Sequence, residues 1–365
     1  MTELRWEQVD VERPQGSLFD EPVFEREPGR GEFRGIEFLH VRSQRIVNEV
    51  RGAPFGFRYS INAYRGCSHA CTYCFARPSH TYLDLDADRD FERSIVVKVN
   101  AVSLLRRELD PRRWSGDLIA MGTNTDPYQR AEGKYRLTRG IVEVLADAAN
   151  PFSILTKSTL VLRDLDLLAE AARRTDVRVN LSIATLDEDV WRATEPGTPH
   201  PRRRIRAVEQ LNAAGVPCGV LIAPVLPRLS DQPEQLEAVV AACIEAGARS
   251  ISPVLLHLRP GVKDIYLSRL AETHPHLVDD MRRRYRDGAY APRADQQALA
   301  TLVRDLVRRH GGTAVNAVGA PHPPPDATTL DPDGPPAQAV APPGRHRGRA
   351  RTPSDREGTT QLSLL

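Results

Sequence analysis

The chain has 365 residues, of which 41% are hydrophobic and 27% are charged, as in an ordinary soluble protein. Its formal charge of +2, from 50 basic and 48 acidic side chains, excludes a global electrostatic attraction to nucleic acid, although it does not exclude a local basic face. No apolar run approaches the ~20 residues of a membrane helix, and Met1 to Asp20 lacks the apolar stretch of a secretory signal. A cytoplasmic protein without a membrane segment is expected.

Residues 1–50 carry scattered charge, Pro and Gly with little periodicity, which predicts an extended N-terminal arm. From Phe57 onward, short apolar runs alternate with helical patterns, and this order predicts parallel strands joined by helices. About six such βα units, fewer than the eight of a full barrel, favour an α/β fold with a partial, open-sided barrel. The expected strands are Arg58–Ala63, Leu118–Met121, Phe152–Leu155, Val177–Ile183, Val216–Ala223 and Ser250–Leu255, with Ser94–Val99 as an extra one.

Two helices can be predicted from the spacing of their apolar residues. In Gln232–Ala246, and again in Leu299–Val307, apolar residues recur at i, i+3, i+4, i+7 and i+8, the pattern of a helix with one face on a core. Each of these segments should therefore cover the sheet.

The C-terminal part has a different composition. Regular patterns stop near His310, and ten of the 29 prolines lie between Pro321 and Pro353, a composition that cannot bury enough apolar surface to fold. Residues 318–360 are therefore expected to be disordered. The chain divides into an extension over 1–50, a core with C-terminal helices over 51–315, and a Pro-rich tail over 316–365.

Three of the five cysteines lie within eight residues. Cys67, Cys71 and Cys74 have the spacing Cys-x3-Cys-x2-Cys directly after a predicted strand, which in a reducing cytosol indicates metal ligation rather than disulfides. Such a loop can hold three corners of an iron-sulfur cubane and leave one iron for another ligand. The alternative is a Cys3His zinc site that uses His69 or His80, although the usual paired Cys-x2-Cys pattern is missing.

The segment Asn62–Cys74, including the aromatic residue before the last cysteine, resembles the radical S-adenosylmethionine (SAM) superfamily. Within it, the chain is most similar to the spore-photoproduct-lyase-like group, often labelled DNA repair photolyases. The similarity covers roughly residues 57–260. Further matching segments are Gly122–Gln129, Thr156–Ser158, Leu181–Ile183, Glu195–Pro196 with Arg204, and Ala223–Asp231.

This resemblance implies a radical SAM barrel whose [4Fe-4S] cluster is held by Cys67, Cys71 and Cys74. The open iron would bind the amino and carboxylate groups of SAM. One electron from an external donor would then cleave the sulfonium to methionine and a 5′-deoxyadenosyl radical, which abstracts a hydrogen atom from the substrate. The protein would supply position and a dry cavity.

Polar residues at strand ends are the first candidates for cofactor contacts, because ligands lie beyond the C-terminal ends of parallel strands. The resemblance places the SAM amino group at the turn that contains Thr123, Asn124 and Thr125, and the SAM carboxylate at Lys157 and Ser182. For each of these residues alone, an ordinary turn, helix cap or solvated surface charge is the alternative interpretation.

Glu195, Arg204 and Asp231 are expected in loop or substrate-side contacts, while the run Arg202–Arg206 also fits the solvated face of a helix. Cys218 is a weak candidate for a catalytic hydrogen donor, by resemblance to the cysteine with that role in spore photoproduct lyase. A buried structural thiol is the favoured interpretation of Cys218 and Cys243.

The ends of the chain suggest partners. Gln361–Leu365 resembles short peptides that bind the bacterial DNA sliding clamp, and Gln15–Phe19 is a poorer version, although chance can produce such short motifs. Arg345–Arg351 is either a contact to phosphates or a charged linker. The predicted function is a radical SAM enzyme that acts on nucleic acid, by lesion repair or base modification. The alternatives are the same chemistry on a peptide or small molecule, and a non-enzymatic metal-bearing adaptor.

Overall fold

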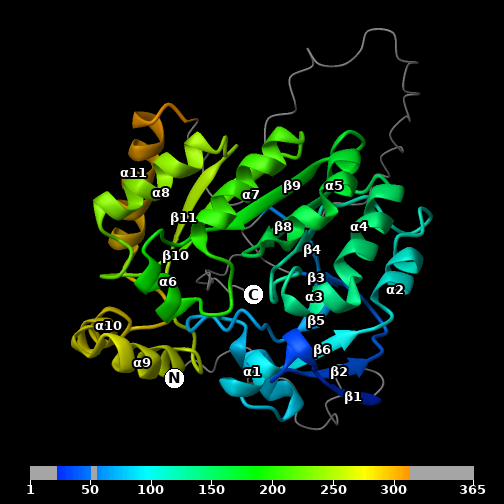
Figure 1. Ribbon diagram of the computed structural model, residues 1–365, viewed down its shortest axis with the longest axis horizontal. Coiled ribbons are helices and arrows are strands. Elements are labelled where there is room, and N and C mark those ends of the chain that lie inside the picture. The colour runs from blue at the N-terminus through cyan, green and yellow to red at the C-terminus, as the bar shows by residue number, and fades with distance from the viewer. Residues whose placement is uncertain (1–22, 51–55, 313–365) are drawn as a thin grey trace, which may run out of the picture.

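The computed structural model describes residues 23–50 and 56–312, which form two sheets surrounded by helices (Figure 1). The main sheet has the strand order β11-β10-β9-β8-β7-β4-β3, and the small sheet has the order β1-β2-β6-β5. The main-sheet strands are β3 (Val47–Glu49), β4 (Tyr59–Ile61), β7 (Ile119–Met121), β8 (Phe152–Thr156), β9 (Val177–Ser182), β10 (Cys218–Val225) and β11 (Ile251–Leu255).

Six strands of the main sheet, from β4 to β11 in sheet order, pair in parallel, while β3 runs antiparallel along the edge of β4. The predicted partial barrel of six βα units is therefore confirmed. Helical segments follow these strands, as expected for crossover connections. The α-helices are α1 (Arg89–Arg93), α2 (Ala101–Glu108), α3 (Arg130–Tyr135), α4 (Leu137–Asp147), α5 (Leu165–Ala172), α6 (Glu188–Thr194), α7 (Pro201–Ala213), α8 (Pro233–Glu245), α9 (Lys263–Thr273), α10 (Val278–Arg284) and α11 (Arg293–Arg309).

The two helices predicted from apolar spacing are α8 and α11. The apolar stripe of α8 is buried from Leu236 to Cys243, and α11 buries Leu299, Val303, Leu306 and Val307. The two helices pack against each other, and α11 also packs on β11. One apolar face on each helix is enough to form this layer.

The expectation of an extended arm over residues 1–50 is wrong for the described part of that range. Residues 23–50 contain β1 (Glu25–Pro28), β2 (Glu37–Val41) and β3, and four of the five residues of β2 are buried. β2 lies between β1 and β6 (Ser94–Lys98), so Ser94–Val99 does form the extra strand, but in the small sheet. This sheet also holds the two-residue strand β5 (Tyr64–Arg65).

These strands are too short to give a recognisable strand pattern in the sequence. β1 reads Glu-Arg-Glu-Pro, and β2 is covered on both faces, so neither shows a clear alternation of apolar and polar residues. Figure 1 shows the small sheet and α1 on one side below the main sheet, with α9 and α10 on the other side.

Several predictions about the ends lie outside the described residues. These are the disorder of 318–360, the basic stretch Arg345–Arg351, and the peptides Gln15–Phe19 and Gln361–Leu365. Among the described residues, none of the helices combines the length and apolar character needed to cross a membrane.

Candidate active site

The candidate site is formed where the parallel strands end. The cysteine loop follows β5, the Gly122 turn follows β7, Lys157 directly follows β8, and Ser182 is the last residue of β9. Leu221 of β10 pairs with Ser182, so that Ala223 lies just beyond it at the same edge of the sheet. Segments separated by more than 150 residues in the chain therefore share one edge.

The cysteine loop is tightly fixed by backbone hydrogen bonds. Cys67 N–H donates to the Phe91 carbonyl at 2.9 Å, and Cys74 N–H donates to the Cys71 carbonyl at 3.2 Å. Thr72 N–H donates to the Thr194 carbonyl at 3.0 Å, which joins the loop to the end of α6. The loop is therefore held by α1 on one side and by the segment after β9 on the other.

All three loop thiols are free and set among apolar side chains. Cys67 and Cys71 are only 7% and 6% exposed, and Cys74 is half-buried. Burial raises the pKa of each thiol, in the case of Cys71 to about 12. Thiols of this kind suit a cationic partner that stabilises the thiolate form.

The donor set fits a cubane better than the zinc alternative. In residues 23–50 and 56–312, no three His, Cys, Asp or Glu side chains are grouped as ligands of one metal ion. A cubane does not need such convergence, because each thiolate binds a different iron. Both proposed zinc histidines have other partners. His69 Nδ1 lies 3.3 Å from Asp126 Oδ2, and His80 Nε2 lies 2.9 Å from the Ser94 carbonyl oxygen.

Arg77 supports the loop from behind. Its guanidinium is fully buried and donates to the Cys71 carbonyl from Nε at 3.1 Å and from Nη2 at 2.9 Å. It also donates to the Ala70 carbonyl at 3.3 Å and forms ion pairs with Asp88 and Glu92. The planar fork of arginine suits several carbonyls and carboxylates at once.

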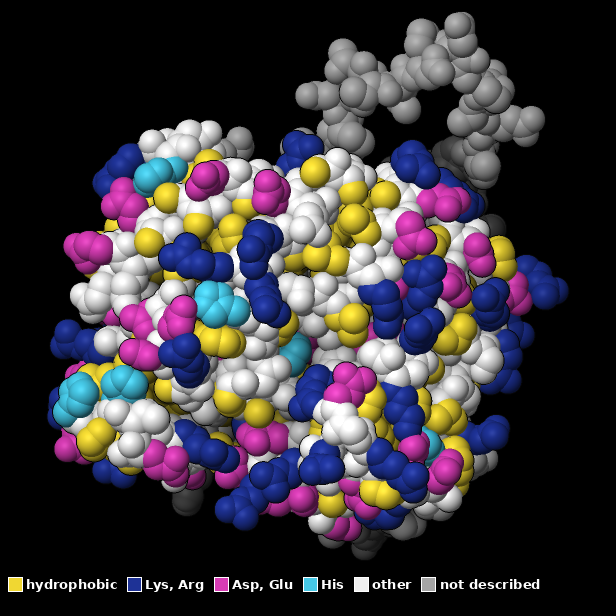
Figure 2. Space-filling model, viewed as in Figure 1, with side chains coloured by type: hydrophobic (Ala, Val, Ile, Leu, Met, Phe, Trp, Pro, Cys, Tyr) yellow, Lys and Arg dark blue, Asp and Glu magenta, His cyan; other side chains and the backbone are white. Residues whose placement is uncertain are grey.

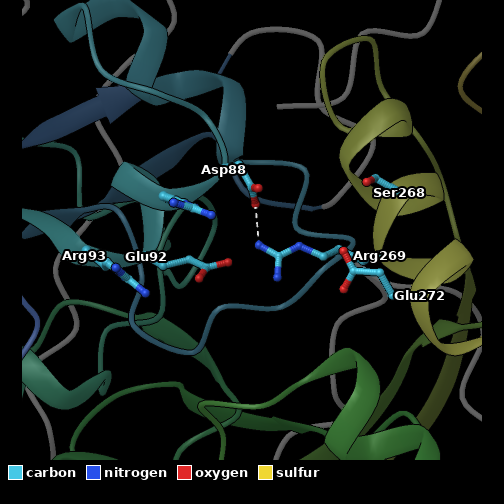
Figure 3. Close-up of a pocket in the computed structure, with 7 residues that line it drawn as sticks. Asp88, Glu92, Arg93, Ser268, Arg269 and Glu272 are labelled. Carbon is cyan, nitrogen blue, oxygen red and sulfur yellow. Dashed lines mark hydrogen bonds and ion pairs between the residues drawn. The ribbon is translucent and has the colours of Figure 1, made fainter.

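A polar cavity of about 390 Å³ lies outside this support, between α1 and α9. Figure 3 shows the ion pair of Asp88 with Arg269 of α9, which is 2.9 Å long, and Glu92 and Arg93 on the opposite side. Asp88 therefore bridges Arg77 and Arg269, and ties α9 to the segment that holds the cysteine loop.

The turn after β7 is joined to the same loop. Asn62 donates from Nδ2 to Thr123 Oγ1 and accepts from Asn124 N–H, both at 3.2 Å. Thr125 is 5% exposed, and its hydroxyl donates to the Gly66 carbonyl at 2.7 Å. Thr123 and Asn124 are half-buried, whereas Thr125 uses its hydroxyl inside the protein.

Asp126 contacts several residues at this edge of the sheet, although no role is predicted for it from the sequence. Its carboxylate accepts from Thr156 Oγ1 at 2.6 Å and from Lys157 N–H at 2.7 Å, and it lies beside His69. Burial alone would raise its pKa, but the contact with His69 and these hydrogen bonds lower the pKa. One carboxylate thus links the cysteine loop to the end of β8.

Lys157 and Ser182, predicted on neighbouring strands, are in direct contact. Lys157 Nζ donates to Ser182 Oγ at 2.7 Å and to the Ala223 carbonyl at 3.0 Å. It also lies 3.0 Å from Glu195 Oε1. The three protons of the ammonium group therefore have three partners.

Glu195 and Arg204 belong to the site, and Glu195 is 1% exposed while Arg204 is fully buried. Glu195 accepts from Arg204 Nη2 at 2.6 Å and from the hydroxyl of Tyr73, which lies between two loop cysteines. Burial would raise the pKa of Glu195, but the charges of Arg204 and Lys157 outweigh it and lower the pKa to about 2. Glu195 therefore carries a buried negative charge shared by two cations.

The arginine run after Pro201 is divided by the helix that contains it. Arg202, Arg203 and Arg206 of α7 are exposed, as the solvated-face interpretation expects, while Arg204 points inward. The sequence offered one signal for this difference, the match of Glu195–Pro196 with Arg204.

Three other residues singled out in the sequence are two cysteines and Asp231. Cys218 begins β10, five residues before Ala223, and is fully buried in the main core together with Cys243. Asp231 accepts from Arg228 N–H at 2.8 Å in the turn before α8. Cys218 thus lies at the opposite end of β10 from Ala223, whereas Asp231 follows the C-terminal end of that strand, and its loop or substrate-side contact stays a prediction.

Comparison with known proteins gives the family. The model of the radical SAM superfamily matches residues 61–240. An uncharacterized protein of Mycobacterium tuberculosis is 44% identical over 280 residues, which are 76% of this chain and 82% of that protein. An uncharacterized protein of Methanocaldococcus jannaschii is 32% identical over 196 residues, which are 54% of this chain and 70% of that protein.

Solved structures show the same fold. A spore photoproduct lyase variant gives a TM-score of 0.57 at 18% identity and covers 80% of this chain and 84% of that chain. Another variant, with bound AdoMet and dinucleoside spore photoproduct, gives 0.56 at 18% identity, covering 78% and 84%. The match of the superfamily model, together with the cysteine loop at the edge of a six-stranded parallel sheet, shows that the chain belongs to the radical SAM superfamily.

Proposed function

We propose that this protein is a radical SAM enzyme whose substrate is nucleic acid, and that Cys67, Cys71 and Cys74 hold its [4Fe-4S] cluster. The observation that carries the proposal is the contact between the buried three-thiol loop and the ends of β8 and β9, through Tyr73, Glu195 and Lys157. When bound, the cluster and SAM supply the reductive cleavage that yields methionine and a 5′-deoxyadenosyl radical, with the electron coming from an external donor.

The residues of the chain then have distinct tasks. Thr123 and Asn124, half-buried at the turn after β7, would hold the SAM amino group. Thr125 positions the cysteine loop through the Gly66 carbonyl, because its hydroxyl is already used there. Cys67 and Cys71 are almost completely shielded from solvent, which suits a reacting centre that has to exclude water.

Lys157 and Ser182 would hold the SAM carboxylate. To do so, Lys157 exchanges one of its three partners for the incoming carboxylate. The partner released is the neutral Ala223 carbonyl, which also accepts from Ser182 Oγ at 2.7 Å, so that Glu195 continues to orient Lys157. Lys157 can therefore bind the SAM carboxylate at the strand ends while every buried charge of the network keeps a partner.

Nucleic acid is the proposed substrate because the fold matches structures of a spore photoproduct lyase with a bound dinucleoside lesion. The reaction is proposed as a lyase-like repair or base modification. Modification of a peptide or small molecule remains the second candidate, since fold and cofactor do not fix the substrate.

The test begins with anaerobic reconstitution of the full chain with iron and sulfide. After addition of SAM and dithionite, 5′-deoxyadenosine should form, and its formation should rise with damaged DNA or RNA. The variants C67A, C71A and C74A should lose the cluster absorbance, whereas C243A, which replaces a core thiol, should keep it. An intact cluster that cleaves no SAM would contradict the enzyme proposal.

A further inference from the structure

A second cavity, of about 840 Å³, lies on the outer side of α7, between the α6–α7 connection and α8. The side chains of Trp191, Thr198 and His200 line it at the α6 end, and Ala242 and Ala246 line it on α8. It is separate from the cysteine loop, yet its α6 end belongs to the segment that follows β9.

Three arginines lie at one end of this cavity, which forms a groove along α7. Arg202, Arg203 and Arg206 line it, all three are exposed, and within the described residues none of their guanidinium groups has a hydrogen bond or an ion pair. Arg202 and Arg206 are also like charges at positions i and i+4 of one helix. The first turn of α7 has no acidic residue, so positive charge stands at the positive end of the helix dipole.

This arrangement is unfavourable for the isolated protein. Like charges in one helix, placed at its N-terminal end, repel one another and the dipole, while an anion bound between them would relieve both effects. Figure 2 shows basic side chains over the region of α7 on the face that Figure 1 presents, with acidic side chains beside them over α6. The groove thus has a local positive charge that the overall charge of +2 conceals.

One hydroxyl group connects the groove to the candidate active site. Thr198 Oγ1 accepts from Trp191 Nε1, in the groove, at 2.9 Å, and from the buried Arg204 Nη2 at 2.5 Å. The same hydroxyl donates to the Glu195 carbonyl at 2.8 Å. A ligand at the α6 end of the groove therefore lies one side chain away from the Glu195–Arg204 pair.

The two ends of the groove carry opposite charges. Glu209 and Glu245 line it farther along α7 and at the end of α8. A polyanion is thus attracted to the arginine end, which leads toward the strand ends, and repelled from the other end. An aromatic residue beside a basic groove is the combination that single strands use for stacking and phosphate contact.

We propose that the groove of α7 binds the phosphodiester backbone of the nucleic-acid substrate through Arg202, Arg203 and Arg206. This inference rests on the proposed function and names the surface by which the substrate is held. The arginines contact phosphates, and they therefore contribute affinity without reading the base sequence.

The test uses the full chain with its cluster reconstituted, and fluorescence anisotropy of labelled single-stranded DNA and RNA oligonucleotides. The variant R202Q/R203Q/R206Q should bind about tenfold more weakly at moderate salt, and the slope of log affinity against log salt should fall by about two. A matched control, R173Q/R174Q/R304Q, removes the same charge from exposed arginines elsewhere and should bind like the wild type.

Unchanged affinity in the groove variant, with its cluster absorbance and Tm intact, would overturn the inference. The inference would also be overturned if polyglutamate, added at the same concentration of negative charge, displaced the oligonucleotide. The groove would then bind an acidic peptide as well as it binds nucleic acid. Binding is measured without turnover, so the two proposals can fail separately. Arginine-dependent binding without SAM cleavage would contradict the proposed reaction only, and SAM cleavage with arginine-independent binding would contradict the groove only.

Discussion

Glu195 and Arg204 are joined by a hydrogen-bonded ion pair of 2.6 Å that is almost completely shielded from water. The pair stands at the centre of the strand ends, because Arg204 Nη1 also donates to the Ser182 carbonyl at 2.9 Å and Glu195 contacts Lys157. A buried pair of this kind is costly to break, since one partner would remain as an uncompensated charge.

The substitution E195Q should therefore affect both stability and SAM binding. We expect a loss of about 3–5 kcal/mol in the free energy of unfolding, because Arg204 remains buried without its anion. We also expect a higher KM for SAM, because Lys157 loses the partner that orients it. Denaturant titration and SAM-dependent 5′-deoxyadenosine formation measure the two effects. E170Q, at an exposed position of α5, should change neither, and a wild-type KM in E195Q would refute the orienting role.

Arg77 offers a second test, directed at the cysteine loop. In R77K, a single ammonium group replaces the guanidinium group that donates to the Cys71 and Ala70 carbonyls. The cysteine loop should then bind less iron. Iron and sulfide per chain after reconstitution should fall clearly, together with Tm. The same exchange at exposed Arg89 is the control. If R77K held a full cluster, the support by Arg77 would be dispensable.

The Gly122 turn can be tested with a matched pair of glycines. Gly122 has φ +89°, and a Cβ there would lie 2.0 Å from the Leu155 carbonyl oxygen, whereas Gly215 has φ +80° with open space around it. G215A should cost about 1 kcal/mol for the left-handed backbone alone. G122A should cost clearly more and weaken SAM binding, because Thr123 and Asn124 must shift. Equal Tm values for the two variants would argue against this close approach.

A pH effect is expected from His257, whose ring stacks on Tyr290 at 5.6 Å. Burial, followed by the charge of Arg259, lowers the pKa of His257 to about 4. Between this value and an unfolded pKa of about 6.5, the unfolded chain binds more protons, so stability decreases as the pH falls through that window. In H257F the decrease should be smaller, by about 1–3 kcal/mol. Denaturation of both proteins at pH 7 and pH 4.5 measures it, and parallel curves would contradict the assignment.

The sequence was sufficient to predict the six parallel strands of the main sheet, because strands such as β9 alternate apolar and polar residues and β10 is a long apolar run. It also placed Lys157 and Ser182 together, since both end neighbouring strands. The small sheet could not be predicted, because β5 has only two residues and depends on its partner β6. Apart from the family match at Glu195–Pro196 and Arg204, the sequence pattern does not distinguish buried Arg204 from the exposed arginines around it, because the difference arises from tertiary packing.

The link from β2 through β6 to β5 has a practical consequence for anyone who prepares a shortened protein. β5 ends one residue before Gly66 and two before Cys67, so the loop begins on a sheet in which β2, residues 37–41, is one of the two central strands. A fragment that starts at residue 61, where the superfamily match begins, would omit that strand and leave the backbone groups of β6 that face it unpaired. Such a fragment should aggregate or lack the absorbance of an iron-sulfur cluster. A fragment that starts before β1 keeps the small sheet that supports the cysteine loop.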